Sequence, residues 1–417
     1  MIGRLLRNLF SQKPVPGEKP NYISFSADGI RHTSFRMQKK DIRRLERQWK
    51  EYMVGVPPFP DKFEGKGIVI AAGGIIFFTC AWVNIHSLRK HGCKLPIEVW
   101  YVGSELTPEV IRQLERFNVT CVDALAYGWC DMPMLSLKPF SIINSRFKEV
   151  LYLDADIVAV ADPTFLFEGE QYLQSGAVFW PDFWKTDKSN PIWKITASSD
   201  YGSFEQESGQ ILVDKEKSWK ELQLCLHFNL SFQDYYKILL GDKDTFKFAW
   251  LALKSSYYMI PAPTGICGFE DRDGGFCGLS MVQYDYLGNV IFIHRNWLKW
   301  DFTKDDEPVW MELKRISGSP ANGRPHYVTF VRDDISFTFF DFKGEVFVEN
   351  FSELFGDLEL YCLEVLKELR RSEFYAKFLL HTYFVHFRPG NPTFMGNLSH
   401  WRMPKTKREP ELMARAL

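Results

Sequence analysis

The alternation of strand and helix patterns between residues 66 and 153 constrains the fold of this 417-residue chain more than any other feature. Apolar runs typical of buried strands cover residues 67–72, 96–102, 118–122 and 150–153. An apolar helix pattern fills 75–89, and Thr107, Pro108 and Glu109 combine an N-cap, a first-turn proline and an acid, which favours a helix start. Strands that alternate with helices form a parallel sheet with crossover helices. The sequence therefore predicts an α/β fold.

The last of these strands ends at two carboxylates, Asp154 and Asp156, separated by one small residue. Two anions this close repel each other, and each is costly to desolvate unless a cation lies between them. In open parallel sheets, ligands bind beyond the carboxyl ends of the strands. Carboxylate oxygens there are typical ligands of a divalent metal. We therefore predict that Asp154 and Asp156 belong to a metal site.

A later apolar strand pattern, residues 291–294, ends in a histidine, His294. A histidine in this position is often a packed residue, but beside a strand-end Asp-x-Asp we predict it to be the third metal ligand. One imidazole with two carboxylates favours Mn²⁺, with Mg²⁺ as the alternative. Lys299, five residues further on, and Lys138, at the start of an expected helix, are predicted to contact a diphosphate.

Other polar or small residues have two open interpretations each. Ala71 and Gly73 lie in the first strand–helix turn, which lacks a full dinucleotide fingerprint; it is either a tight turn or a site for a base or ribose. Asp242 and Asp244 open an amphipathic helix, either as helix-terminus acids or as sugar-binding groups. Residues 179–184 place four aromatic rings around one acid, either as core or as a sugar-binding wall.

Composition and segment patterns bound the rest of the chain. We expect three parts: an N-terminal flexible segment with an exposed helix in residues 1–60, a catalytic domain in 61–305 and an α+β extension in 306–417. Within the extension we expect antiparallel strands at 328–350, helix at 352–385 and then a basic tail. The basic, amphipathic N-terminus suggests peripheral membrane contact. The sequence has no run of 18 apolar residues, so no transmembrane helix is expected. No signal peptide is recognisable, which predicts a cytoplasmic protein. With 51 basic and 52 acidic residues, no nucleic-acid partner is expected.

Residues 66–300 resemble the GT-A fold glycosyltransferases, and specifically the fungal mannosyltransferase family that includes the α-1,3- and α-1,2-mannosyltransferases of Golgi mannan synthesis. The resemblance rests on these segments in chain order: YLDAD-x-x-x-x-x-DPT-x-LF, AVFWPDFW, ESGQ-x-LVDK, GDKDTF-x-x-AWLAL, GICG and FIHRN-x-x-KW. A more distant similarity is to the glycogenin and galactosyltransferase-like family, in which an Asp-x-Asp, a later histidine and a nearby lysine bind Mn²⁺ and the diphosphate.

The resemblance implies a metal-dependent, retaining transfer of a hexose from a nucleotide sugar to a glycan hydroxyl, with GDP-mannose as the favoured donor and a UDP-hexose as the alternative. It implies these roles: Asp154, Asp156 and His294 at the metal; Ala71, Gly73, Lys138, Asp154 and Lys299 at the nucleotide; Glu207, Gln210, Asp242 and Asp244 at the sugar. Asp244 is the best candidate for a nucleophile. The non-enzymatic alternative is a carbohydrate-binding protein that has lost catalysis. It predicts that metal ligands have been replaced, but Asp154, Asp156 and His294 are all present.

Overall fold

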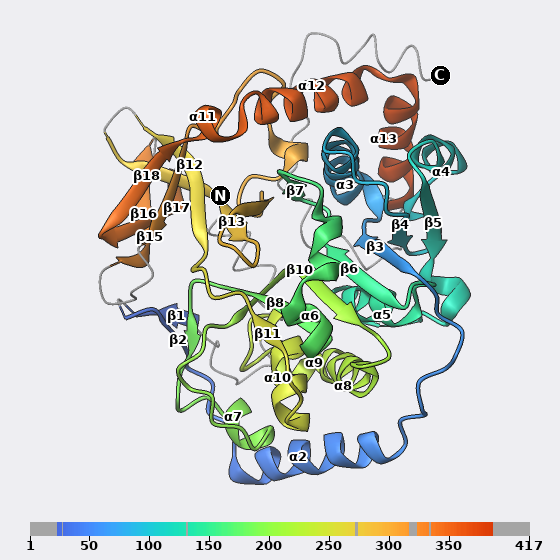
Figure 1. Cartoon of the computed structure of the whole chain (residues 1–417), viewed down its shortest axis with the longest axis vertical. Coiled ribbons are helices and arrows are strands. Elements are labelled where there is room, and N and C mark those ends of the chain that lie inside the picture. The colour runs from blue at the N-terminus through green and yellow to red at the C-terminus, as the bar shows by residue number, and fades with distance from the viewer. Residues whose placement is uncertain are drawn as a thin grey trace.

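The computed structural model describes residues 23–26, 28–130, 132–271, 274–316, 323–332 and 335–386 (Figure 1). The predicted N-terminal lead with its membrane contact, and the predicted basic tail, lie outside these residues. Within the described part of the chain, no helix has both the length and the apolar character needed to cross a membrane.

A seven-stranded sheet forms the centre of the molecule, in the order β11-β8-β10-β6-β3-β4-β5. Its strands are β3 (Lys66–Ala71), β4 (Ile97–Tyr101), β5 (Val119–Asp123), β6 (Glu149–Leu153), β8 (Ala177–Pro181), β10 (Gln206–Asp214) and β11 (Tyr258–Met259). The four strands β3 to β6 pair in parallel, whereas β10 is antiparallel to both β6 and β8. The predicted α/β class with a mostly parallel sheet is therefore confirmed.

Helices cover both faces of this sheet (Figure 1). The longer ones are α2 (Lys39–Val54), α3 (Gly74–Lys90), α4 (Pro108–Glu115), α5 (Leu137–Asn144), α8 (Trp219–Leu230), α10 (Lys243–Leu253), α12 (Leu358–Arg371) and α13 (Glu373–His386); the short ones are α6 (Glu170–Ser175), α7 (Ile192–Ile195), α9 (Phe232–Tyr235) and α11 (Phe351–Phe355). Successive strand residues point to opposite faces. Ile68 therefore joins the core with α3, α4, α12 and α13, and Val69 joins the core with α2, α5, α8 and α10.

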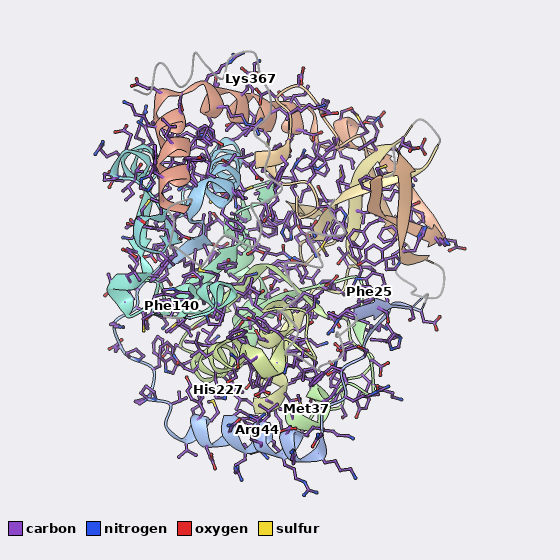
Figure 2. The ribbon with its side chains drawn as sticks, turned by 180° about the vertical axis from the view of Figure 1, so that it is seen from behind. Phe25, Met37, Arg44, Phe140, His227 and Lys367 are labelled. Carbon is purple, nitrogen blue, oxygen red and sulfur yellow. The ribbon has the colours of Figure 1, made fainter. Side chains whose placement is uncertain are left out.

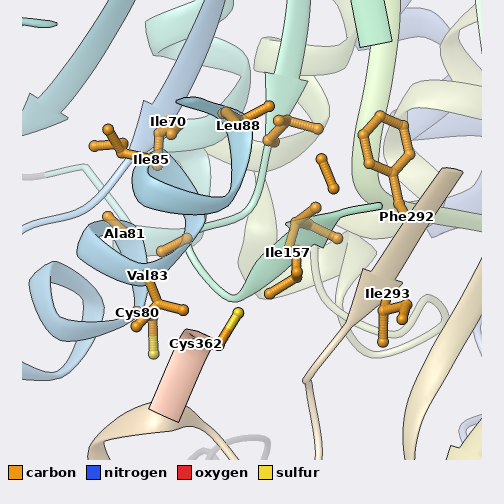
Figure 3. Packing of buried hydrophobic residues seen from close by; sticks show 14 of the residues in the cluster. Ile70, Cys80, Ala81, Val83, Ile85, Leu88, Ile157, Phe292, Ile293 and Cys362 are labelled. Atoms are coloured by element: carbon orange, nitrogen blue, oxygen red, sulfur yellow. The ribbon is translucent and has the colours of Figure 1, made fainter. Parts of the chain in front are cut away.

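The local signals that predicted the helices are visible in the structure. The Thr107 side chain caps α4 by accepting a hydrogen bond from the backbone N–H of Val110 at 3.3 Å. Helix α3 is apolar nearly all round, and its residues 78–85 are all buried; Figure 3 shows Ile157 of the short strand β7 (Ile157–Ala159) and Cys362 of α12 near its residues. The helical stretch predicted at 352–385 is three helices, and the first ends at Gly356, whose φ of 58° favours glycine.

A second sheet is antiparallel and joins residues 265–294 to the C-terminal strands. Its order is β16-β17-β13-β12-β15-β18, with β14 beside β13 and β7 beside β14. Its other strands are β12 (Gly265–Glu270), β13 (Phe276–Tyr284), β14 (Val290–His294), β15 (Glu312–Ile316), β16 (Gly323–Arg332), β17 (Ile335–Gly344) and β18 (Val346–Asn350). Strand β12 pairs with β15, and β13 with β17, so strands from both sides of residue 305 share one sheet.

The N-terminal segment packs onto this body as a hairpin followed by a helix. Strands β1 (Ile23–Phe25) and β2 (Ile30–Thr33) form the hairpin, and β2 pairs in parallel with β9 (Lys185–Thr186). Figure 2 shows Arg44 of α2 at the opposite end of the molecule from Lys367 of α12. Arg44 donates hydrogen bonds of 3.1 Å to Asp234, which holds α2 against α9.

Candidate active site

The strand-end carboxylates and the predicted histidine meet at the carboxyl edge of the central sheet. Asp154 and Asp156 lie between β6 and β7, and the pairing of β7 with β14 places His294 opposite Ile157. Nε2 of His294 is 3.2 Å from Oδ1 of Asp156 and 4.0 Å from Oδ2 of Asp154. The structure therefore brings together the three residues predicted as metal ligands.

Strand β10 adds a fourth side chain, Glu207, to this edge. Because β10 runs antiparallel to β6, its first residues lie where β6 ends, and the N–H of Asp154 donates to the Gly209 carbonyl at 2.7 Å. Glu207 Oε1 is 3.1 Å from Nδ1 of His294 and accepts a 2.7 Å hydrogen bond from the Gly209 N–H. A β carbon on Gly209 would lie only 2.7 Å from Nδ1 of His294, so glycine permits this close approach.

Both lysines predicted to contact a diphosphate bind the strand-end carboxylates. Lys138, in the first turn of α5, places Nζ 3.1 Å from Oδ1 of Asp154 and 3.2 Å from Oδ2 of Asp242. The same ammonium donates to the Ser208 carbonyl at 2.9 Å. Lys299 forms an ion pair with Asp156. Cations and anions thus alternate across the edge of the sheet.

The electrostatics of this cluster are dominated by buried charges. Burial alone would raise the pKa of Asp156, but Lys299 and His294 outweigh it and hold that pKa well below its usual range. Burial likewise opposes the charge on His294, yet Asp156 and Glu207 raise its pKa to about 10. A metal bound to His294 would replace its proton, and the four carboxylates (Asp154, Asp156, Glu207 and Asp242) would then exceed the two lysines by two negative charges, which equals the charge of one divalent cation.

The donor set also fits a divalent metal in its geometry. Asp154 and His294 offer ligand atoms that lie within 4.8 Å of each other. The 3.2 Å separation between Asp156 and His294 is close to the value of about 3 Å expected for neighbouring ligands on one octahedral ion. A carboxylate on the far nitrogen of a ligating histidine orients the ring, and Glu207 lies at that nitrogen. The sequence predicted Glu207 at the sugar and did not predict its contact with His294.

A second, largely buried charge network adjoins the first. The guanidinium of Arg31 on β2 donates to Glu205 at 2.6 Å and lies 3.5 Å from Asp244. Lys243 binds Glu205, Asp182 and Asp244 at 2.7, 2.9 and 3.1 Å. Burial would raise the pKa of Glu205, but Arg31 and Lys243 outweigh it and lower that pKa to about 2. Arg31 had no sequence signal, because its partner lies 174 residues away.

The two acids at the start of α10 belong to different networks. Asp242 occupies the N-cap position of α10, as one interpretation of the sequence predicted, but its side chain makes no capping bond and binds Lys138 instead. Asp244 is fully buried, and its Oδ1 accepts a 3.2 Å hydrogen bond from the Gln206 N–H. Gln210, also buried, has no hydrogen-bond partner for either carboxamide atom among the described residues.

The first strand–helix turn holds an acid that the sequence pattern did not reveal. Ala71 ends β3, and Gly73 precedes α3. The carboxylate of Glu105 occupies the space where a Gly73 side chain would lie, and it accepts a 2.8 Å hydrogen bond from the Val102 N–H. In the aromatic segment, Phe179 and Trp180 are fully buried in the two faces of the central sheet, so the core interpretation holds for these two rings.

Residues 65–206 and 203–285 match the model of a protein family described as "Mannosyltransferase putative", and together they span more than half of the chain. The chain belongs to this mannosyltransferase family. The motif resemblance to fungal mannosyltransferases is thereby confirmed. The end of β6 and the start of β10, which carry the carboxylate cluster, lie within these matched residues.

Curated relatives of this family member are yeast mannosyltransferases. The α-1,2-mannosyltransferase MNN5 of Saccharomyces cerevisiae is 26% identical over 318 residues, which cover 60% of this chain and 54% of that protein. The α-1,2-mannosyltransferase MNN21 of Candida albicans is 28% identical over 322 residues, covering 62% of this chain and 48% of that protein. This chain thus spans about half the length of the curated relatives it matches.

Solved structures with partial similarity are also glycosyltransferases. The WbbM bifunctional glycosyltransferase is 11% identical, with a TM-score of 0.37 over 49% of this chain and 40% of that chain. Mouse xyloside xylosyltransferase 1 is 13% identical, with a TM-score of 0.34 over 47% of this chain and 85% of that chain.

Proposed function

We propose that this protein is a metal-dependent, retaining glycosyltransferase that moves mannose from GDP-mannose to a hydroxyl group of a glycan. The observation that carries the proposal is the cluster of Asp154, Asp156, Glu207 and His294 with two lysines at the carboxyl edge of the sheet. The curated relatives, which are α-1,2-mannosyltransferases, support mannose as the sugar. A UDP-hexose is the alternative donor for the same site.

The charge balance and ligand spacing support a divalent ion held by Asp154, Asp156 and His294, with Glu207 orienting the imidazole. The donor set of one imidazole and carboxylates favours Mn²⁺. Such an ion, when bound, neutralises negative charge on a diphosphate leaving group.

The chain's own cations then hold the leaving group. Lys138 and Lys299 are paired with carboxylates that would turn to the metal, and this would free their ammonium groups for the diphosphate oxygens. In the transfer, the bond between the sugar C1 and the diphosphate oxygen breaks, and a bond from the acceptor oxygen to C1 forms on the same face. The acceptor proton moves to the departing diphosphate. Positive groups aimed at the developing charge stabilise this transition state.

The sugar side is assigned to the residues that flank this edge. The carboxamide of Gln210 is buried without a partner, which is costly unless a ligand satisfies it. Asp242 forms an ion pair with Lys138, which also pairs with Asp154 of the proposed metal site. Asp244 is held by Lys243, Arg31 and a backbone N–H, so we assign it to positioning the start of α10 rather than to nucleophilic attack. Glu105, beside Gly73, is placed to accept a hydrogen bond from a ribose hydroxyl.

The proposal is tested with purified protein, Mn²⁺ and a panel of GDP- and UDP-sugars, scoring release of the nucleotide and transfer to mannosides. We expect release from GDP-mannose that requires metal and is lost in Asp156→Ala. Turnover or binding of no sugar nucleotide, or full activity in Asp156→Ala, would refute the proposal. Turnover of UDP-hexoses alone would select the alternative donor, and binding of glycans without turnover would select the degenerate carbohydrate-binding protein.

A further inference from the structure

A hollow beside Asp182 joins three parts of the chain that are far apart in sequence. Its walls come from the hairpin turn at Asp28, from Asp182 and Phe183 after β8, and from Phe342 of β17. The hollow is partly open to solvent. Binding sites for small molecules commonly lie where separate structural units meet.

The chemistry of these walls fits an uncharged, hydroxyl-rich ligand. The rings of Phe183 and Phe342 meet edge to face at 5.9 Å, and the ammonium of Lys185 lies 5.0 Å from the ring centre of Phe204. Apolar C–H faces of a sugar pack on such rings, while its hydroxyl groups bond to carboxylates. Asp28 and Asp182 oppose the one lysine, so the hollow has no excess positive charge that would select an anion.

The hollow is linked directly to the strand that enters the proposed active site. The carboxylate of Asp182 is 2.9 Å from Nζ of Lys243, and its N–H donates to the Glu205 carbonyl at 2.8 Å. Glu205 precedes Glu207 by two residues, and a strand advances about 3.3 Å per residue, so roughly 7 Å of backbone separates the two. The negative charge of Glu207 adds to burial in raising the pKa of Asp182 to about 6, which also indicates that the two carboxylates are close.

We propose that this hollow is the acceptor subsite and that it holds a neutral hexose unit of a glycan against Asp182, Phe183, Phe204 and Phe342. The inference rests on the proposed function and adds the place where the acceptor binds. It also gives the strands after residue 305 a role, because Ile316, Pro325 and Phe342 of β15, β16 and β17 line the hollow. These strands would then select the acceptor, while the central sheet binds the donor.

The test compares Asp182→Asn and Phe204→Leu with the wild type and with a control, Phe347→Leu, whose ring is 56% exposed on β18. Binding of α-mannobiose is measured by calorimetry, with and without saturating GDP and Mn²⁺. Binding of GDP with Mn²⁺ is measured separately in all four proteins and reports whether the donor site is folded.

We expect both hollow variants to bind α-mannobiose about 10-fold more weakly than the wild type and the control, since an aromatic or hydrogen-bonding contact of this kind contributes about one such factor. Equal affinity for α-mannobiose in all four proteins, or no binding in any of them, would overturn the acceptor subsite. If the wild type fails to bind GDP but the variants still lose α-mannobiose binding, the hollow stands as a carbohydrate site and the proposed donor falls.

Discussion

Replacing Gly209 with alanine would place a methyl group between His294 and Glu207. The new β carbon would lie 2.7 Å from Nδ1 of His294 and 2.8 Å from Oε1 of Glu207, whereas ordinary contacts begin at 3.4 Å. The side chains must therefore retreat by roughly 0.6 to 0.7 Å. The Gly209 backbone itself tolerates alanine, because its φ lies outside the left-handed region.

The expected effect is a loss of metal affinity rather than of the fold. Retreat of Glu207 breaks its 3.1 Å contact with His294, and loss of such an orienting partner lowers metal affinity about 10- to 100-fold. That range corresponds to about 1.4 to 2.8 kcal/mol of binding free energy. Overpacking of this kind also costs about 1 to 3 kcal/mol of stability, so circular dichroism and thermal unfolding come first.

The assay is calorimetric titration of Mn²⁺ into the folded variant, with Gly202→Ala as the matched control. A β carbon on Gly202 would meet nothing within 4 Å, so the same substitution there leaves every contact intact. We expect Gly202→Ala to bind Mn²⁺ as the wild type does. If folded Gly209→Ala also binds with unchanged affinity, the assignment of Glu207 and His294 to the metal site is wrong.

Three further predictions use other parts of the structure. Arg31→Met leaves Glu205 with a buried, weakly compensated charge, so it should lower the free energy of unfolding by about 3 to 5 kcal/mol, measured by urea denaturation. The control Arg47→Met, at an exposed position, should leave that free energy unchanged. If the two variants unfold at the same urea concentration, the network of Arg31 does not stabilise the fold. Burial lowers the pKa of His86 to about 4 from 6.5, so the unfolded state binds more protons between these pH values. The free energy of unfolding should therefore fall by about 2 to 3 kcal/mol as the pH drops from 6.5 to 4, and His86→Leu should flatten that dependence; the same slope in both proteins would contradict it. Lys299→Gln should reduce kcat for sugar transfer by about 10²- to 10³-fold in initial-rate assays, and wild-type kcat would exclude a contact with the leaving group.

The sequence predicted those features that depend on local patterns. The four parallel strands β3 to β6 follow from apolar runs, and the start of α4 follows from Thr107, because each signal lies within a few residues of its effect. Asp154, Asp156 and His294 were found for the same reason: each ends or follows a strand, and the ends of neighbouring strands meet.

Features that depend on strand register or on distant partners were missed. The contact of Glu207 with His294 was not predicted, because it depends on β10 entering between β6 and β8 with an irregular register after Glu207. The contact between Arg31 and Glu205 depends on the docking of the N-terminal hairpin beside β9, for which the sequence carries no local signal.

The cover that α12 and α13 form over α3 has a consequence for how the chain folds during synthesis. Thr79 of α3 is 2.8 Å from the hydroxyl of Tyr375, and Phe78 meets Phe378 edge to face at 5.2 Å. Lys90 ends α3 and Glu373 begins α13, so about 280 residues must leave the ribosome before this contact forms. At 5 to 20 residues per second, that takes roughly 15 to 60 s. Throughout that time α3, one of the most apolar helices of the molecule, is not covered by α12 and α13. Chaperone binding to nascent chains should therefore concentrate on α3.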